Sequence, residues 1–347
     1  MPTPERSRER GLDAVRVLAM LAIVAGHLWT TAAWVRPVFF TWHVPIWFFL
    51  AGYLWNERRS LAAEIRHRAL TILLPFAAWI VVLTLVVNHD HVGSSLHDVA
   101  QQAWDAEGFV RPFWAFWFAL ALFFAALLYR LVTPLPWLPR TALVLGTTTV
   151  VSVAAAHGHH LPLDLGQGAV CTTWILAGHA LRRICRGAQR RWGEWHDLRA
   201  YRAGIGAVLL IGAALGIAVS QTELDLDLHL LDLGAPVVSV LVSVAICTGL
   251  VLVGSTVPGA AVPAVTTDLA RATLVVMLVH LAVIDQIDGF AHRSVGELIV
   301  VLTAAWGVGL VLLGVPKAWW LTGQRQPGSP TGEISRRIPQ PASAHAE

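Results

Sequence analysis

Apolar runs close to 20 residues long recur along almost the whole chain, and they constrain its fold more than any other feature. A run of this length is what an α-helix needs to cross the hydrocarbon core of a bilayer. The chain has 347 residues, of which 56% are hydrophobic and 14% charged, whereas soluble domains carry roughly 25% charged residues. These runs lack the alternation of membrane β-barrel strands. Only α-helices and closed β-barrels satisfy all of their backbone hydrogen bonds in lipid. We therefore predict an all-α polytopic membrane protein.

We predict a bundle of about ten transmembrane helices. The predicted spans cover residues 15–34, 38–55, 70–88, 113–132, 141–156, 168–181, 203–220, 234–254, 270–287 and 297–314. The transmembrane domain is expected to occupy residues 1–320. The remaining residues, 321–347, are rich in Pro, Ser and Gly, which is typical of a disordered tail.

The positions of the basic residues predict the orientation of these spans. With the N-terminus placed inside, 22 of the 25 Lys and Arg residues fall in inside segments, and only Arg36, Arg111 and Arg293 fall outside. Cytoplasmic loops of membrane proteins carry such an excess of positive charge. The pattern predicts a multi-pass protein of the cell membrane with both termini in the cytoplasm.

The predicted outside loops are rich in Asp and His instead. The simplest interpretation is that they are solvated polar loops. His157, His159 and His160 could also bind a metal, but their spacing fixes no coordination geometry, and we predict no metal site. The three cysteines lie far apart and form no metal-binding or redox motif.

The first span contains three polar residues on one helical face. At 100° and 1.5 Å per residue, Arg16 lies within about 20° and Asp13 within about 40° of His27 around the helix, and His27 lies about 16 Å along the axis from Arg16. Ionisable groups inside a span usually mark a pathway or a functional site. A simpler alternative is that Asp13 and Arg16 cap the membrane entrance while His27 bonds a neighbouring carbonyl. The run is long enough to be an uncleaved helix rather than a signal peptide.

The second predicted span, 38–55, contains His43 near its start, where the chain enters from the outside. It is followed by four arginines in a short cytoplasmic segment: Arg58, Arg59, Arg66 and Arg68. The positive-inside rule alone accounts for these arginines. A phosphate clamp is the functional alternative, because guanidinium groups bind phosphate oxygens in a bidentate manner.

Several of these segments resemble the acyltransferase-3 family of membrane acyltransferases. "RGLDAVRVLAMLAIVAGH" (10–27) has that family's Arg, ten residues, then His, and "HVPIWFFLAGYL" (43–54) resembles its aromatic stretch before Gly and Tyr. Weaker similarity is found in "FWFALALFFAALLY" (116–129), "ILAGHALRR" (175–183) and "LARATLVVMLVH" (269–280). The resemblance extends over about residues 10–315.

The sequence departs from the family pattern at three positions. Thr71 stands where a second arginine often precedes the Leu-x-x-Pro motif, with Arg68 in the first position and Arg66 one helical turn earlier as a substitute. Ala51 replaces the usual Ser, and Met277 stands where Tyr is common. The first of these changes bears on donor binding.

The resemblance implies transfer of an acyl group, typically acetyl from cytoplasmic acetyl-CoA, to a hydroxyl of a glycan or other small acceptor. Acetyl-CoA is expected as a co-substrate, with no permanently bound cofactor and no nucleic acid partner. Histidine suits the removal of a hydroxyl proton. We therefore expect His27 to be the catalytic base, with Arg16 and Asp13 on the same helical face, either by direct transfer or through an acyl-His27 intermediate.

The remaining predicted site residues bind the two substrates. Arg10, Arg66 and Arg68 are expected to hold the CoA phosphates, and His43, Trp47 and His280 are expected to bind the acceptor. A second hypothesis is a polytopic transporter or export partner in which Arg16 and His27 serve ion coupling. The sequence shows no internal repeat of the kind found in many transporters, which favours the enzyme.

Overall fold

The computed structural model describes residues 4–87, 92–105, 109–192, 196–220, 224–287 and 294–324. The described chain is almost entirely helical, and its one β-bridge joins Asp227 and Asp232. The prediction of an all-α membrane protein is confirmed. The helices are α1 (Pro4–Leu28), α2 (Pro45–Tyr53), α3 (Leu61–Arg68), α4 (Leu74–Val87), α5 (Val92–Asp105), α6 (Trp117–Val132), α7 (Trp137–Ala156), α8 (Leu165–Trp192), α9 (His196–Val219), α10 (Pro236–Thr256), α11 (Val265–Ile287), α12 (Val295–Gly314) and α13 (Trp319–Thr322), with shorter turns η1 (Arg36–Phe40), η2 (Ala69–Leu73), η4 (Trp114–Phe116), η5 (Pro162–Asp164) and η6 (Gly259–Ala261).

Eight helical segments in the described residues are long and apolar enough to cross a membrane. They are Arg10–Leu28, Leu61–Val87, Trp114–Val132, Trp137–Ala156, Leu198–Val219, Pro236–Thr256, Val265–Ile287 and Val295–Gly314. Each matches one of the ten predicted spans. The second predicted span, 38–55, is a broken segment that contains η1 and α2. The sixth predicted span, 168–181, lies within α8.

The second predicted span is broken because Pro45 has no amide hydrogen to continue a helix from the preceding turn. The π-turn η1 ends at Phe40, and α2 begins at Pro45 and has only nine residues. This short helix lies against α8, and two glycines allow the close approach. A Cβ atom at Gly52 would overlap the Ile175 carbonyl, and one at Gly178 would overlap the Phe49 carbonyl. Together α2 and α8 therefore form a closely packed pair of helices.

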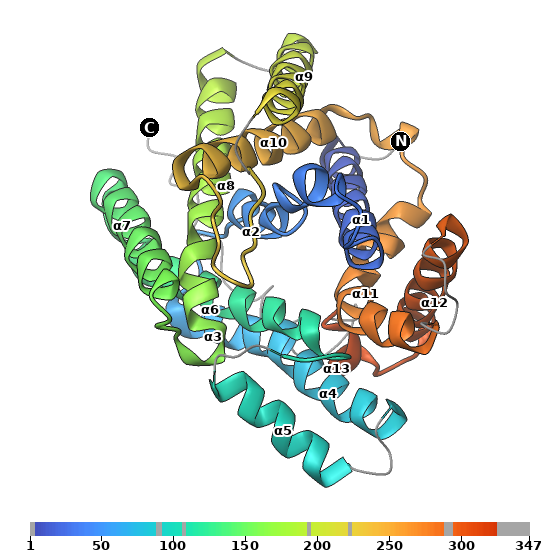
Figure 1. The fold of residues 1–347 in the computed structure, drawn as a ribbon. Helices are drawn as coiled ribbons and strands as arrows, with labels where there is room; N and C mark the ends of the chain where they lie inside the picture. The colour runs from blue at the N-terminus through green and yellow to red at the C-terminus, as the bar shows by residue number, and fades with distance from the viewer. Residues whose placement is uncertain are drawn as a thin grey trace, which may run out of the picture.

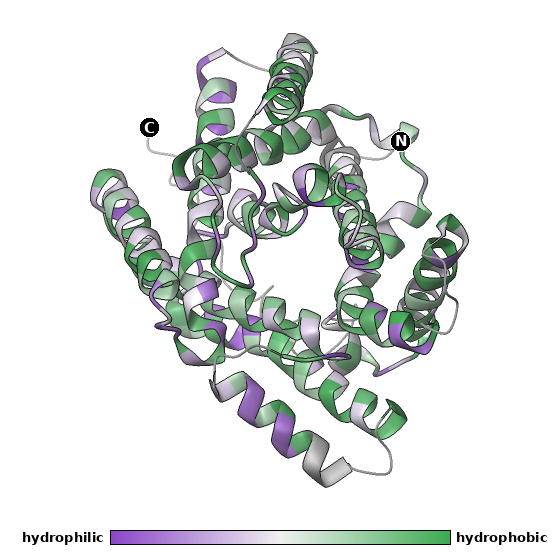
Figure 2. Ribbon diagram, in the orientation of Figure 1, coloured by the Kyte–Doolittle hydropathy of each residue, from purple (hydrophilic) through white to green (hydrophobic). Residues whose placement is uncertain are grey.

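The helices form an inner and an outer group. Figure 1 shows α1, α2, α10, α11, α4 and α6 surrounding the middle of the molecule, with α7, α9 and α12 at the periphery. The outer helices expose large apolar side chains such as Leu138 on α7 and Val208 on α9, as expected of surfaces that face lipid. Figure 2 shows hydrophobic residues over most of the ribbon and hydrophilic residues on α5 and near the end of α8.

Three further differences from the predicted elements concern their extent. The third span is continuous from Leu61 to Val87, because α3, the π-turn η2 and α4 follow each other without a break. Helix α5 forms within a segment predicted as an outside loop, with Val99 buried. Helix α13 covers residues 319–322 and so includes the first two residues of the predicted tail; it accepts a hydrogen bond from Trp79 at the Leu321 carbonyl (2.9 Å). The tail beyond residue 324 lies outside the described residues.

Candidate active site

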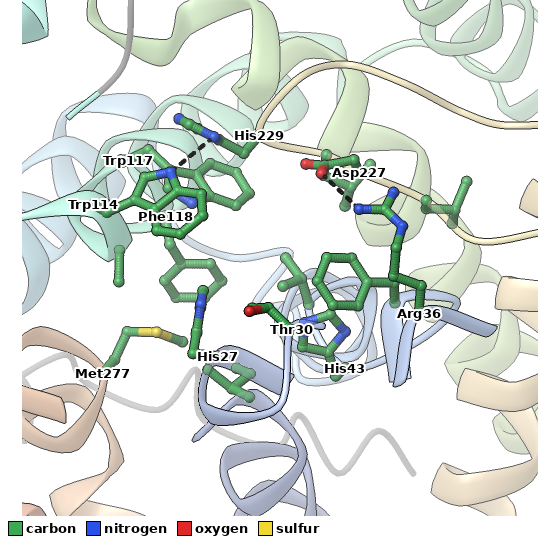
Figure 3. Close-up of a pocket in the computed structure, with 16 residues that line it drawn as sticks. His27, Thr30, Arg36, His43, Trp114, Trp117, Phe118, Asp227, His229 and Met277 are labelled. Carbon is green, nitrogen blue, oxygen red and sulfur yellow. Dashed lines mark hydrogen bonds and ion pairs between the residues drawn. The ribbon is translucent and has the colours of Figure 1, made fainter. Parts of the chain in front are cut away.

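A cavity of about 180 Å³ lies at the end of α1 that carries His27. Its walls come from α1, the segment between α1 and α2, η4 and the start of α6, the loop before α10, and α11 (Figure 3). The lining residues are Ile23, His27, Thr30, Arg36, Phe40, His43, Val44, Trp114, Ala115, Trp117, Phe118, Leu226, Asp227, Leu228, His229 and Met277. The chain thus brings together residues that are more than 200 positions apart.

His27 is placed at this cavity by the last turn of α1. Its ring lies between two other rings, with centroid distances of 5.2 Å to His280 and 5.7 Å to Trp114. The side chain is half-buried. The imidazole is therefore next to rings from two other elements and still reaches the cavity.

His280 is fully buried on α11, next to His27. Its Nδ1 atom lies 3.0 Å from the Val276 carbonyl and 2.9 Å from the Met277 carbonyl. Because a carbonyl oxygen only accepts, Nδ1 carries the ring hydrogen, and Nε2 is left with its lone pair. Nε2 is buried and has no hydrogen-bond partner among the described residues. His280 itself does not line the cavity, but its ring lies next to that of His27, which does.

His43 lines the cavity from the other side, at the start of the segment that leads into α2. Its Nδ1 donates to the Phe39 carbonyl at 2.6 Å, so its Nε2 also keeps a lone pair. Trp47, predicted to bind the acceptor, lies one helical turn further along. It packs edge-on against Phe118 (6.3 Å between centroids) and does not line the cavity.

The opposite half of α1 carries the predicted Asp13–Arg16 pair. The guanidinium of Arg16 donates to the Asp13 carboxylate at 2.7 Å, and Asp13 is only 7% exposed. Arg10 donates to the Gly259 carbonyl at 3.2 Å. The three residues do not line the cavity. Arg10 and Asp13 lie in the first half of α1 and Arg16 at its middle, about 16 Å from His27 when the distance is counted along the helix axis from Arg16.

The predicted donor arginines lie in different surroundings. Arg68 forms a salt bridge of 2.9 Å with Glu64, which is 1% exposed and also pairs with Arg59 (3.4 Å) and Arg130 (3.2 Å). Arg66 is exposed and does not join this cluster. At the position of the family's second arginine, the Thr71 hydroxyl donates to the His67 carbonyl at 2.8 Å. The structure therefore does not place Arg66 and Arg68 together.

The loop before α10 supplies residues that the sequence reasoning missed. Asp225 pairs with Arg36 at 2.7 Å. Figure 3 shows two further contacts: Asp227 pairs with Arg36 at 3.6 Å, and the Trp114 indole donates to Nδ1 of His229 at 3.3 Å. Burial lowers the pKa of His229, which is consistent with a neutral ring that accepts this hydrogen bond. The alternation of Leu with Asp or His over 224–229 was the available signal, because Leu224, Leu226 and Leu228 are buried while the polar residues between them are not.

This arrangement can bind a polar molecule and remove a proton from it. Imidazoles of His27 and His43 face the cavity, the aromatic rings of Trp114 and Trp117 form apolar surfaces, and the Arg36 ion pairs form a polar rim. Rings of this kind stack on sugar and other apolar faces, while imidazole lone pairs accept hydroxyl protons. Among the described residues, no group of three or more His, Cys, Asp or Glu side chains is arranged to hold a metal, and the exposed His157, His159 and His160 form no such group.

The fold and the site define a polytopic membrane protein with a histidine-lined cavity at one end of its helical bundle. Residues 9–323 match the family model described as "Acyltransferase domain", Acyl_transf_3. The chain belongs to this acyltransferase-3 family, and the resemblance seen in its first two spans is confirmed. Comparison with curated proteins and with solved structures gave no match.

Proposed function

We propose that this membrane acyltransferase is an O-acyltransferase that moves an acyl group, typically acetyl, from cytoplasmic acyl-CoA to a hydroxyl of a glycan or other small acceptor. The observation that carries the proposal is the position of His27. It lies at a cavity with a buried histidine behind it, on the same helix as the Asp13–Arg16 pair. Membership of an acyltransferase family favours this function over the transporter hypothesis.

In the proposed reaction, a ring nitrogen of His27 takes the proton from the acceptor hydroxyl. The acceptor oxygen attacks the thioester carbonyl, the carbon–sulfur bond breaks, and the CoA thiolate leaves with the electron pair and is then protonated. A positioned base of this kind contributes about 10²–10⁴-fold to the rate. Direct transfer is the simpler route. A route through an acyl-His27 intermediate would carry out the same transfer in two steps, first from CoA to His27 and then from His27 to the hydroxyl.

His280 has a role in this proposal that differs from the predicted acceptor binding. Its free Nε2 lone pair can accept a hydrogen bond from one nitrogen of His27, which would leave the lone pair of the other nitrogen for the hydroxyl proton. His43 and the two tryptophans of the cavity are assigned to acceptor binding. Arg16 and Asp13 are assigned to the donor side, about one pantetheine length from His27.

The experiment combines an acyl-transfer assay with a search for the acceptor. Cell-envelope glycans and small metabolites from cells with the protein, without it and with His27→Gln are compared by mass spectrometry. A compound that carries the acyl mass only with the wild-type protein identifies the acceptor, and purified protein with acetyl-CoA should then transfer the group. Purified wild-type protein that neither transfers nor hydrolyses any acyl-CoA would contradict the proposal.

A further inference from the structure

A second hollow, of about 590 Å³, lies at the end of α2 that is opposite to His43. It is lined by the loop from Leu54 to Arg59 and by Arg182 and Arg186, which lie one turn apart on α8. We call it the basic groove. The charge pattern of the sequence predicts that this end of the molecule faces the cytoplasm.

Arginine side chains from α6 and α8 hold the backbone of the groove loop in place. Arg182 donates to the Trp55 carbonyl, and Arg130 donates to the Asn56 carbonyl at 2.7 Å. The Arg130 guanidinium also stacks on the Trp55 ring, 4.2 Å from its centroid. Two adjacent carbonyls of an exposed loop are thus fixed by arginines from α6 and α8.

A third anchor holds the Glu57 side chain. Its carboxylate accepts a hydrogen bond from Nε2 of His179 at 2.7 Å, and Nδ1 of His179 accepts one from the Tyr129 hydroxyl at 2.7 Å. His179 and Tyr129 are fully buried. The hydrogen bond from His179 lowers the pKa of Glu57, so the carboxylate is charged and already occupied at neutral pH.

The groove arginines differ in how far they are already paired. Arg59 pairs with Glu64, and Arg182 is engaged by the Trp55 carbonyl. Arg58 and Arg186 make no salt bridge within the described parts of the chain. Two guanidinium groups on a fixed frame therefore face the groove with unused donors, and the one carboxylate among the lining residues is Glu57.

We propose that the basic groove is a binding site for a phosphate-bearing ligand, held by Arg58 and Arg186 with Arg59 and Arg182 beside them. Guanidinium groups bind phosphate oxygens through paired hydrogen bonds, and a loop fixed before binding loses little entropy. The ligand chemistry fits two sources: the phosphates of a soluble nucleotide such as coenzyme A, and the headgroup of an acidic phospholipid. The proposal concerns binding alone and does not depend on the acyl-transfer reaction.

The test measures binding to full-length protein in phosphatidylcholine nanodiscs, with free coenzyme A as the soluble probe. A parallel arm measures retention of phosphatidylglycerol by native mass spectrometry. Arg58→Ala/Arg186→Ala is compared with Arg190→Ala/Arg199→Ala, which removes the same charge from positions outside the groove. One lost charge-assisted contact reduces affinity about tenfold or more.

The proposal predicts that only the groove pair weakens binding of at least one probe, and the affected probe identifies the source of the phosphate. Unchanged binding of both probes, or equal losses in both double variants, would overturn it. If the alanine double variant fails to insert into the membrane, the single variants Arg58→Gln and Arg186→Gln are tested for binding in the same way. If the groove binds a probe but the purified protein transfers no acyl group, the proposed function is refuted and the proposed phosphate site is not.

Discussion

The imidazoles of His27 and His280 lie 5.2 Å apart, centroid to centroid, although 253 positions separate them in the chain. Helix α1 carries the first and α11 the second (Figure 1). The backbone carbonyls of Val276 and Met277 fix the hydrogen of His280 on Nδ1. His280 is therefore a positioning residue for His27 in the proposed reaction, and this role predicts a specific change in kcat and KM.

His280→Leu should lower kcat while the KM values for donor and acceptor change little, because the hydrogen-bond acceptor for His27 is lost and His280 is proposed not to touch the acceptor substrate. His280→Gln, which leaves one hydrogen-bond acceptor near His27, should keep more of the kcat. Steady-state kinetics with both substrates varied provide the measurement. A large rise in acceptor KM at constant kcat would return His280 to acceptor binding.

Arg68→Ala should destabilise the protein more than Arg66→Ala. Arg68 forms the shortest salt bridge to the buried Glu64, whereas Arg66 is exposed. Loss of a hydrogen bond to a charged group costs about 1.5–3 kcal/mol, and Arg59 and Arg130 remain to compensate the carboxylate. Thermal unfolding in detergent compares the two variants. Equal melting temperatures, combined with a raised donor KM in Arg68→Ala, would favour the phosphate clamp expected from the sequence.

Gly178→Ala should disrupt the contact between α8 and α2. The added Cβ would overlap the Phe49 carbonyl, and backbone atoms cannot move aside as a flexible side chain can. Gly187→Ala is the matched control on the same helix, because no atom lies within 4 Å of its added Cβ. We expect loss of about 1–3 kcal/mol or failed expression in the first variant and unchanged or higher stability in the second. Equal stability of both would show that the helices are further apart.

Asp164→Asn should stabilise the protein at pH 8 but not at pH 4. Burial in the turn before α8 raises the pKa of Asp164 to about 7 from its usual value of 3.8. The folded state therefore holds this proton more tightly than the unfolded state does, and stability falls as the pH rises from about 4 to 7. Asparagine removes this penalty. Melting temperatures of wild type and variant at the two pH values measure the effect, and a pH-independent difference would contradict it.

Reporter fusions test the predicted orientation of the chain. Fusions after residues 160 and 227 should report an outside location, and fusions after residues 62 and 190 an inside one. The loop of residue 227 includes Asp227 and His229 of the candidate active site, so the same experiment assigns a side to the cavity. An inside signal at residue 160 would overturn the span assignment from α7 onward.

The sequence predicted those parts of the fold and site that depend on local pattern. Apolar length identified eight of the spans, and helical periodicity placed Asp13, Arg16 and His27 on one helix. The break at Pro45 also has a sequence signal, but the run around it is so apolar that length alone suggested a full span. Helix α5 was missed because it is amphipathic: Leu96, Val99 and Ala103 recur at helical spacing among polar residues, and a search for continuous apolar runs does not detect this pattern.

The parts that could not be predicted depend on contacts between distant segments. Nothing in the sequence near Glu64 indicates that Arg130 reaches it from α6, and Arg68 therefore looked free to bind a ligand. The pairing of Arg36 with Asp225 and of Trp114 with His229 likewise depends on how the loop before α10 folds over the cavity. Residues of such loops have no periodic signal that assigns them to a site.

The central claim is that His27 is the base of the acyl transfer, and the kcat of His27→Gln tests it most directly. Glutamine keeps a hydrogen-bonding group but cannot accept a proton at neutral pH. The matched control is His159→Gln, because His159 is exposed and does not line the cavity. Both proteins must be purified at equal yield, with membrane insertion verified in the same samples. The account predicts a kcat about 10²–10⁴-fold lower in His27→Gln with an unchanged donor KM, and wild-type kinetics in His159→Gln. A near-wild-type kcat in a properly inserted His27→Gln protein would contradict it.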